Sequence, residues 1–417
     1  MIRSQSWRLG IVAERDFGLL WLGRTLSLVG DYAFRVALIT YLVSATGSAW
    51  SVAAAGAALL VPALVFYLFG GVSGDRAASR RRMMIGADLL RFAAVAAIAV
   101  AILQNASPAL VVALALLIGV GDGFFQPVSF ALLTEIVPKH RLVAANSANS
   151  IGQQFALIGG PLLGSLLVDT LGPSVAFGFD AATFLLSGLC ILGIRQPARR
   201  EVTPVGESTG ARQVLAEISS GLRYVLTQRW LVLSFAVGAV ANAVFTGNLD
   251  VTVPFILSPS GVGEAADLGW FYALEGVGAL LGAVLLLRVA RTNVGAPMFG
   301  MLALMASSLA LVGYFGNNPG TYVMAIVYGV GLHFFNSLFP ALLQEKVPDA
   351  LMSRVGSLVF LAFNGLMPLG TLVMGPLIGL LAPAGTVLLS ASVVAVVCLL
   401  AAFTPSIRAL HLTAPPA

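Results

Sequence analysis

The chain is poor in charged residues. Asp, Glu, Lys and Arg together make up 10% of its 417 residues, whereas soluble domains hold about a quarter. Hydrophobic residues make up 58%, and the mean hydropathy is strongly positive at +0.94. A water-soluble globular fold is therefore excluded, and the composition predicts an integral membrane protein.

Lysine, histidine and cysteine are scarcer still, and this excludes several classes of function. Neither Lys139 nor Lys346 ends a phosphate-binding loop, so we expect no ATP-driven pump. The 3 histidines are dispersed and no HExxH or GxSxG pattern occurs, which leaves a membrane enzyme as the weaker alternative. Cys190 and Cys398 lie inside apolar spans and imply no disulfide. We expect no enzyme, no cofactor, no metal site and no binding of nucleic acid.

One stretch of the sequence occurs twice, half a chain length apart. GVGDGFFQPVSFALLTEIVP at 119–138 returns at 329–348 as GVGLHFFNSLFPALLQEKVP, with eleven of twenty positions identical. A second echo follows each copy, GPLLG at 160–164 and GPLIG at 375–379. A repeat of this size predicts two related halves.

Apolar segments of roughly 20 residues or more can cross the ~30 Å hydrocarbon layer as helices. The sequence predicts twelve such spans, and hence an all-α membrane protein. They are expected at 17–45, 49–73, 83–104, 108–133, 144–169, 174–194, 230–257, 268–288, 295–315, 321–343, 354–381 and 384–403.

The loops between these spans alternate in charge. The odd-numbered loops contain no Lys or Arg, whereas every even-numbered loop contains at least two basic residues within it or at its boundaries. Because Lys and Arg mark cytoplasmic loops, both termini are expected in the cytoplasm of a bacterial-type inner (plasma) membrane protein.

The long central connection separates the two halves. Its first part is polar, and residues 211–228 space apolar side chains at helical intervals, which predicts an amphipathic helix at the cytoplasmic surface. We therefore expect three parts: six helices in 1–200, a linker at 201–228 and six helices in 229–417. A tether is favoured over a regulatory role for the linker.

A glycine-rich motif with an acid and a basic cluster lies between spans 2 and 3. It reads GGVSGDRAASRRR at 70–82 and resembles the loop signature of the major facilitator superfamily. That resemblance implies two pseudo-symmetric six-helix bundles, with one central cavity that opens alternately to each side. It also implies a cytoplasmic conformational latch formed by Gly71, Gly74, Asp75 and Arg76.

Further motifs resemble the branch of this family that holds enterobactin exporters and macrolide-efflux proteins. They are FFQP at 124–127, LTEIVP at 133–138 and LVAANS at 142–147. Gly160, Pro161 and Gly164 also resemble the helix-5 signature of drug/proton antiporters, and Gly375, Pro376 and Gly379 repeat it in helix 11; both are expected to permit a kink.

This resemblance implies export of a small amphiphilic compound, such as a drug, siderophore or other natural product, by a monomer that exchanges protons across the lipid bilayer. A proton-independent facilitator or an importer of the same fold remains open. The substrate within this class also remains open.

Ionisable residues inside the bilayer are costly and are candidates for function. The family resemblance implies that helices 1, 4, 7 and 10 line the cavity. The candidates for substrate binding and proton coupling are Asp31, Arg35, Asp122, Asp250, Glu275 and His333.

Two of these acids are expected to play different roles. Asp31 and Arg35 are four residues apart on one helix face, which predicts an ion pair that helps to bind substrate. Asp122 has no basic residue within a helical turn of its own span, so burial is expected to favour its uncharged form. We therefore expect Asp122 to carry the coupled proton.

Overall fold

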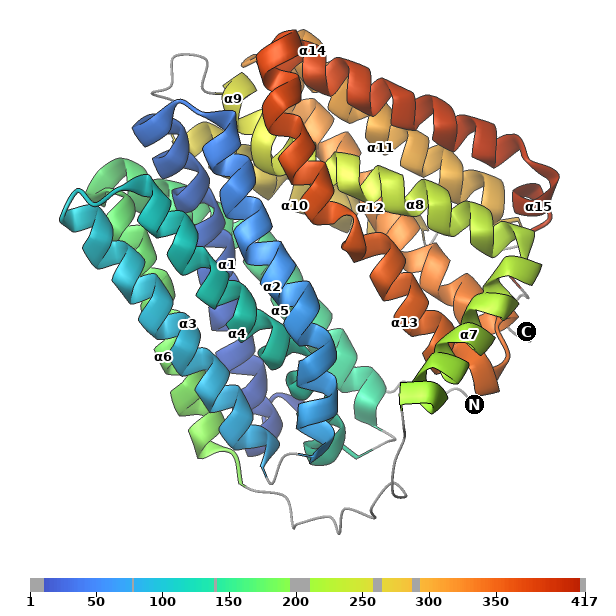
Figure 1. The fold of residues 1–417 in the computed structure, drawn as a ribbon, viewed down its shortest axis with the longest axis horizontal. Helices are drawn as coiled ribbons and strands as arrows, with labels where there is room; N and C mark the ends of the chain where they lie inside the picture. The colour runs from blue at the N-terminus through green and yellow to red at the C-terminus, as the bar shows by residue number, and fades with distance from the viewer. Residues whose placement is uncertain are drawn as a thin grey trace. The chain divides into compact units, whose positions relative to one another are not determined.

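A computed structural model describes residues 11–76, 79–138, 141–195, 211–257, 265–286 and 293–412. These residues form helices joined by short turns, with no strand in the part of the chain that is described. The helices are α1 (Arg15–Thr46), α2 (Ala49–Arg76), α3 (Arg80–Leu103), α4 (Pro108–Ile136), α5 (Leu142–Leu171), α6 (Pro173–Gly193), α7 (Ala211–Thr227), α8 (Arg229–Gly247), η3 (Asn248–Thr252), α9 (Val253–Leu257), α10 (Ala265–Leu286), α11 (Gly295–Phe315), α12 (Pro319–Lys346), α13 (Asp349–Gly365), α14 (Met367–Phe403) and α15 (Pro405–Arg408) (Figure 1).

The predicted all-α membrane fold with twelve spans is confirmed. Eleven described helical stretches are long and apolar enough to cross a membrane, and the last of them, Arg354–Phe403, holds two predicted spans. These two are separated at Ala382, whose φ of 57° and ψ of 166° are not helical, and Pro383 follows directly. A proline disfavours the helical conformation in the residue before it, which explains why the chain turns there.

Short turn signals set the other boundaries. Gly172 between α5 and α6 has a φ of 88°, a backbone conformation that favours glycine. Pro173 follows at the first turn of α6, where its missing N–H leaves no bond unmade. At the start of α3, the Ser79 hydroxyl accepts a hydrogen bond from Arg82 N and caps the helix.

The helices group into two compact units. Unit 1 holds 1–46, 58–203 and 264–273, and unit 2 holds 47–57, 204–263 and 274–417. In unit 1, α1 packs against α5, α6 and α4, and α3 packs against α4 and α6. In unit 2, α11 packs against α12 and α14, and α8 packs against α14 and α13.

The second unit contains two departures from plain α-helix. The span that begins with α8 passes through the π-helical turn η3 before it ends as α9. Such turns are often found at functional sites. The expected amphipathic helix is present as α7, which packs on α13, whereas residues 201–210 of the linker lie outside the described part.

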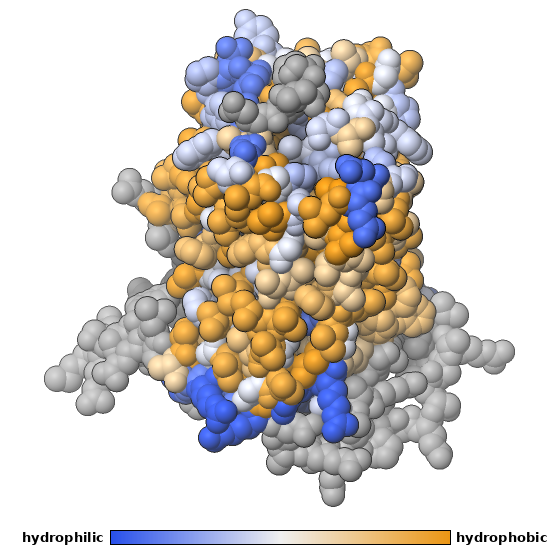
Figure 2. All heavy atoms as spheres, turned by 90° about the vertical axis from the view of Figure 1, so that its left-hand side faces the viewer, coloured by the Kyte–Doolittle hydropathy of each residue, from blue (hydrophilic) through white to orange (hydrophobic). Residues whose placement is uncertain are grey.

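The surface of the first unit suits a bilayer. Figure 2 shows a broad hydrophobic band on this face, with hydrophilic residues gathered above and below it. Large apolar side chains are exposed on α3 and α6, among them Leu89, Leu103, Leu189 and Leu192. Exposed apolar surface of this extent is expected where lipid replaces water as the solvent.

Candidate functional site

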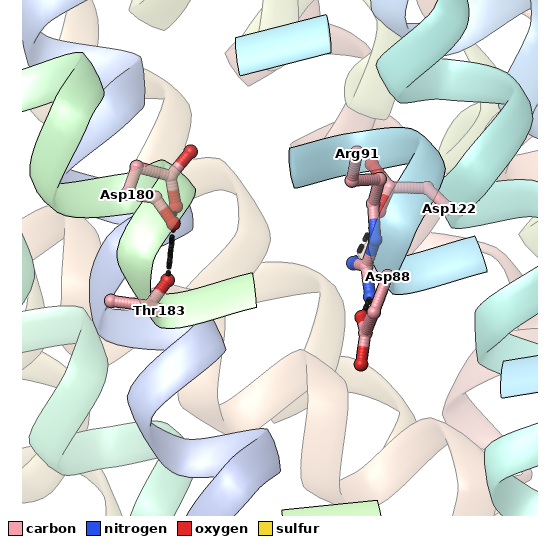
Figure 3. Close-up of polar contacts among 5 residues, drawn as sticks. All are labelled: Asp88, Arg91, Asp122, Asp180 and Thr183. Carbon is pink, nitrogen blue, oxygen red and sulfur yellow. Dashed lines mark hydrogen bonds and ion pairs between the residues drawn. The ribbon is translucent and has the colours of Figure 1, made fainter. Parts of the chain in front are cut away.

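An arginine in the middle of α3 joins two carboxylates inside the first unit. Arg91 Nη2 donates to Asp88 Oδ1, one helical turn earlier, and Arg91 Nη1 donates to Asp122 Oδ1 of α4 at 2.8 Å (Figure 3). The side chains of Arg91 and Asp88 are each 1% exposed, while that of Asp122 is 33% exposed. Asp122 is therefore the one partly exposed member of this set, whereas Asp88 and Arg91 are fully buried.

Aromatic rings and one glycine hold the guanidinium in place. Its central carbon lies 4.2 Å from the ring centroid of Phe125 and 4.3 Å from that of Phe184. Ring faces attract a cation, which offsets part of the cost of burying the charge. Gly121 lets the stem of Arg91 pass against α4, since a Cβ there would collide with Arg91 Cγ and lie 3.1 Å from Cδ.

Two further carboxylates share this part of unit 1. Asp180 of α6 is 1% exposed, and Thr183 Oγ1 lies 3.3 Å from its Oδ1 and 2.7 Å from its backbone oxygen. Asp31 of α1 interacts electrostatically with Asp122, Arg91 and Asp88. It directly follows Gly30, where a Cβ would collide with Asp180 and Thr183. Asp88 and Asp122 thus contact the guanidinium, while Asp31 and Asp180 interact with it electrostatically.

The structure gives Asp31 and Asp122 neighbours from other helices. Asp31 has charged neighbours on α3 and α4, and Arg35 lies 4.6 Å from the ring centroid of Tyr272, so the expected ion pair between Asp31 and Arg35 stays a prediction. Asp122 has no basic neighbour in its own helix, yet Arg91 reaches it from α3. Sequence spacing reports neighbours on one helix only, and here the partners come from other helices.

The remaining ionisable candidates belong to unit 2. Asp250 lies in the π-helical turn η3, and Glu275 on α10 is 6% exposed. His333 on α12 is half-buried, and its Nε2 lies 3.1 Å from Ser337 Oγ, one turn further along. These three residues therefore remain candidates in their own unit.

The structure describes only part of the motif at residues 70–82. The side chains of Gly71, Gly74, Asp75 and Arg76 lie outside the described residues, so the latch stays a prediction. Among the basic residues that follow, Arg80 pairs with Glu135 of α4, and Arg81 Nη2 donates to Leu192 O at 2.6 Å. This part of the basic cluster thus ties α3 to its neighbours.

The two helix-5 and helix-11 echoes do not occupy equivalent places. A Cβ at Gly160 would lie 2.8 Å from Val29 O of α1, and one at Gly370 would lie 2.9 Å from Ala243 Cα of α8. Gly370 therefore matches Gly160, at the 210-residue offset of the long repeat, and Gly375 does not. The predicted kinks remain predictions; the non-helical residue in α14 is Ala382.

The repeat also shows how the halves differ chemically. A Cβ at Gly121 would meet Arg91, whereas a Cβ at the matching Gly331 would lie 2.6 Å from Met301 O and 2.7 Å from Met305 Cβ. The backbone oxygen of Met301 takes the place of that of Ala87, so Met305 stands where Arg91 does, and Leu332 stands where Asp122 does. The same backbone contact therefore carries charge in the first half and apolar side chains in the second.

Sequence reasoning missed Asp88, Arg91 and Asp180. The first two lie in span 3 and the third lies in span 6, outside the four helices that the family resemblance assigned to the cavity. An acid and a base three residues apart within an apolar span are a signal of function by themselves. That signal was available in the sequence.

The chemistry open to this site is the exchange of protons and charged ligands. Among the described residues, no group of three or more His, Cys, Asp and Glu side chains could hold a metal ion. The acids instead offer one partly exposed carboxylate backed by a fixed positive charge.

Comparison with known proteins identifies the family. The family model described as Major Facilitator Superfamily matches residues 20–371 of this chain. The chain is similar to macrolide efflux protein A of Streptococcus pyogenes, with 23% identity over 378 residues and 89% of each chain covered. It is 28% identical over 390 residues to the multidrug efflux pump Tap of Mycolicibacterium fortuitum, covering 89% of this chain and 91% of Tap. It is 25% identical over 378 residues to the enterobactin exporter EntS of Shigella boydii, covering 86% and 84%.

Solved structures share the fold. The nucleoside transporter NupG matches with a TM-score of 0.71 at 15% identity, covering 93% of this chain and 97% of NupG. A POT family transporter matches with a TM-score of 0.72 at 14% identity, covering 93% of this chain and 95% of the other.

Proposed function

The chain belongs to the Major Facilitator Superfamily, and from this membership we propose that it is a secondary active transporter that exports a small amphiphilic compound by proton antiport. The efflux proteins to which it is similar support export. The observation that carries the proposal of proton coupling is the partly exposed Asp122 carboxylate bound to the buried Arg91.

In this proposal Asp122 exchanges the coupled proton. When Asp122 is ionised, its pairing with Arg91 balances the charge, and protonation weakens that pairing. Arg91 stays in place because Asp88 and the rings of Phe125 and Phe184 also hold it. Asp31, which lies in the electrostatic field of this pair, is the acid assigned to the substrate.

The surplus of acids supports this assignment. Asp88 and Asp122 pair with Arg91, Asp31 and Asp180 interact with the same arginine electrostatically, and buried charges without partners are costly. The cluster can lower this cost by holding protons, so it has the capacity that an antiporter needs.

The first prediction concerns Asp122. In inverted vesicles with an imposed pH gradient, Asp122→Asn should bind substrate but lose proton-driven accumulation by about tenfold or more, because the amide cannot exchange the proton. Accumulation is measured with a fluorescent or radiolabelled compound, selected from a panel of drug sensitivities in a strain that lacks its own efflux pumps.

The matched control is Asp16→Asn at the start of α1, outside the charge cluster, which should keep its accumulation. Full accumulation by Asp122→Asn would remove Asp122 from the mechanism and direct attention to Glu275 or Asp250. Accumulation that persists in a protonophore would favour the alternative, a proton-independent facilitator, and proton-driven movement in the reverse direction would favour an importer.

A further inference from the structure

One arginine in the first membrane span has no charged partner among the described residues. Arg24 lies nine residues beyond the start of α1, about 13 Å along the helix axis at 1.5 Å per residue. Its side chain is partly buried, and no carboxylate of the described chain pairs with it or acts on it electrostatically. An arginine inside the bilayer without an anion is costly. Its presence therefore points to a partner that the described chain does not supply.

The two other arginines within the spans of unit 1 have close neighbours. Arg91 is held by two carboxylates and two rings, and Arg35 lies 4.6 Å from the ring centroid of Tyr272. The first span of the second half holds no charged residue at 230–247. An unpartnered cation is therefore a property of Arg24 and not of buried arginines in this chain generally.

The residues beside Arg24 show which side of α1 it occupies. Gly23, just before it, packs against α6, and Thr25, just after it, packs against Gly152 of α5. Leu22 is 44% exposed, as expected where a helix meets lipid. Successive residues lie about 100° apart around a helix. Arg24 therefore lies on the side of α1 between α5 and α6, with Leu22 on the far side.

Three further residues of α1 share this side. Leu28, Asp31 and Arg35 follow Arg24 at spacings of three or four residues, which places them along one helix face. All four side chains are partly exposed. The face thus carries an arginine, an aspartate and a second arginine in turn. A compound that follows it from the start of α1 meets Arg24 before Asp31, the acid assigned to the substrate.

We propose that Arg24 binds an acidic group of the exported compound, which narrows the substrate class to amphiphilic molecules that carry an acid. The proposal rests on the proposed function and on the predicted cytoplasmic position of the start of α1. The planar guanidinium presents paired N–H donors that match the oxygens of an oxyanion. Arg24 is then the first charged contact of the compound on its way out.

Two dyes that differ by one acidic group test this. Anilinonaphthalene sulfonate (ANS) carries a sulfonate that N-phenyl-1-naphthylamine (NPN) lacks. The full chain in nanodiscs of phosphatidylcholine, which has no net charge, is titrated with each dye, and binding is followed by energy transfer from tryptophan. Arg24→Gln should weaken ANS binding about tenfold and leave NPN binding unchanged, because it removes charge-assisted hydrogen bonds to the sulfonate alone.

Arg15→Gln is the matched control, because Arg15 is exposed and lies nine residues earlier, on the opposite side of α1. It should leave the affinity for both dyes unchanged. Arg24→Lys keeps the charge but not the paired donors, so it should weaken ANS binding less than Arg24→Gln does. If the glutamine variant does not fold, the lysine variant decides: ANS binding equal to that of the wild type would count against the proposal.

A lipid headgroup is the second source of an acidic group. Replacing part of the phosphatidylcholine with phosphatidylglycerol separates the two sources, since an anionic lipid that binds Arg24 would displace the dye from it. The ratio of ANS affinities between the wild type and Arg24→Gln should persist in these nanodiscs. A ratio that falls to one would assign Arg24 to lipid and overturn the proposal.

Three further results would also overturn it: no ANS binding by the wild type, an equal effect of Arg24→Gln on both dyes, or no effect on either. The last is expected if Arg24 only extends to the membrane surface. The proposed function fails separately, through the Asp122→Asn accumulation assay, because dye binding needs no proton gradient. Weaker ANS binding by Arg24→Gln together with normal Asp122→Asn accumulation would keep Arg24 as a substrate contact and remove proton coupling at Asp122.

Discussion

At the scale of single residues, Arg91 is the centre of the charge cluster in unit 1. A buried arginine needs partners for its charge, and two carboxylates and two rings provide them here, although the buried Nε of Arg91 has no hydrogen-bond partner among the described residues. Breaking such a pair by removing one partner is more damaging than replacing the whole set, because it leaves an uncompensated buried charge. Arg91 and Asp88 are therefore as much a structural requirement as a functional one.

The prediction at this scale concerns Gly121. Gly121→Ala places a methyl group against the Arg91 stem close to its backbone, so either the arginine or α4 must move. Overpacking of this kind typically costs about 1–3 kcal/mol. We expect a lower unfolding temperature in detergent and weaker transport, measured by thermal unfolding and vesicle accumulation.

Gly86→Ala on α3 is the control, since a Cβ there meets nothing within 4 Å. It should leave the unfolding temperature unchanged or raise it slightly, because alanine is the better helix former. Equal unfolding temperatures for the two variants would show that Gly121 is not needed for close packing.

At the scale of elements, the loop between α2 and α3 leads into the helix that carries Asp88 and Arg91, and this loop is predicted to face the cytoplasm. α2 ends at Arg76 and α3 begins at Arg80, capped by Ser79. Arg80 forms an ion pair with Glu135, which lies near the end of α4 within the repeated stretch 119–138. Its counterpart in the second half, Glu345, pairs with the neighbouring Lys346 at 3.0 Å.

The prediction at this scale concerns Asp75, the acid of the loop motif. Asp75→Asn keeps the size of the side chain but removes the charge that a latch needs, so transport should fall several-fold while membrane insertion stays normal. Asp75→Glu retains the charge and should recover part of the activity. Wild-type transport by the asparagine variant would make Asp75 an ordinary loop residue.

At the scale of the whole molecule, the two sequence halves and the two compact units are not the same division. The repeat predicts halves at 1–200 and 229–417. In the compact units, however, the first turns of α2 are grouped with unit 2 and the first turns of α10 with unit 1. Local similarity along a chain cannot reveal such an exchange, since it depends on which helix ends meet after folding.

The prediction at this scale is the orientation of the chain in the membrane. The alternation of basic loops places both termini and the 195–229 connection in the cytoplasm. In a background that carries Cys190→Ser and Cys398→Ser, single cysteines within 258–267 should react with an impermeant thiol reagent in intact cells, and a cysteine at Ser208 should react only after the cells are opened. The reverse pattern would invert the orientation.

The sequence alone determined the solvent, the helices and the repeat. Hydrophobic length fixes where a helix can cross a bilayer, because every backbone polar group must be satisfied within the helix. The expected spans accordingly agree with the helices to within a few residues at most ends, and the family resemblance carried by residues 70–82 is confirmed by the match over 20–371.

Only the tertiary structure decided which charges meet. Arg91 reaches Asp122 from a different helix, Asp180 comes from α6, and Asp169 finds its partners on α10. Spacing along one helix identifies neighbours three or four residues apart, and it carries no information on the rotation of one helix against another. That rotation sets the side-chain partners, and here it gave Asp122 its cation.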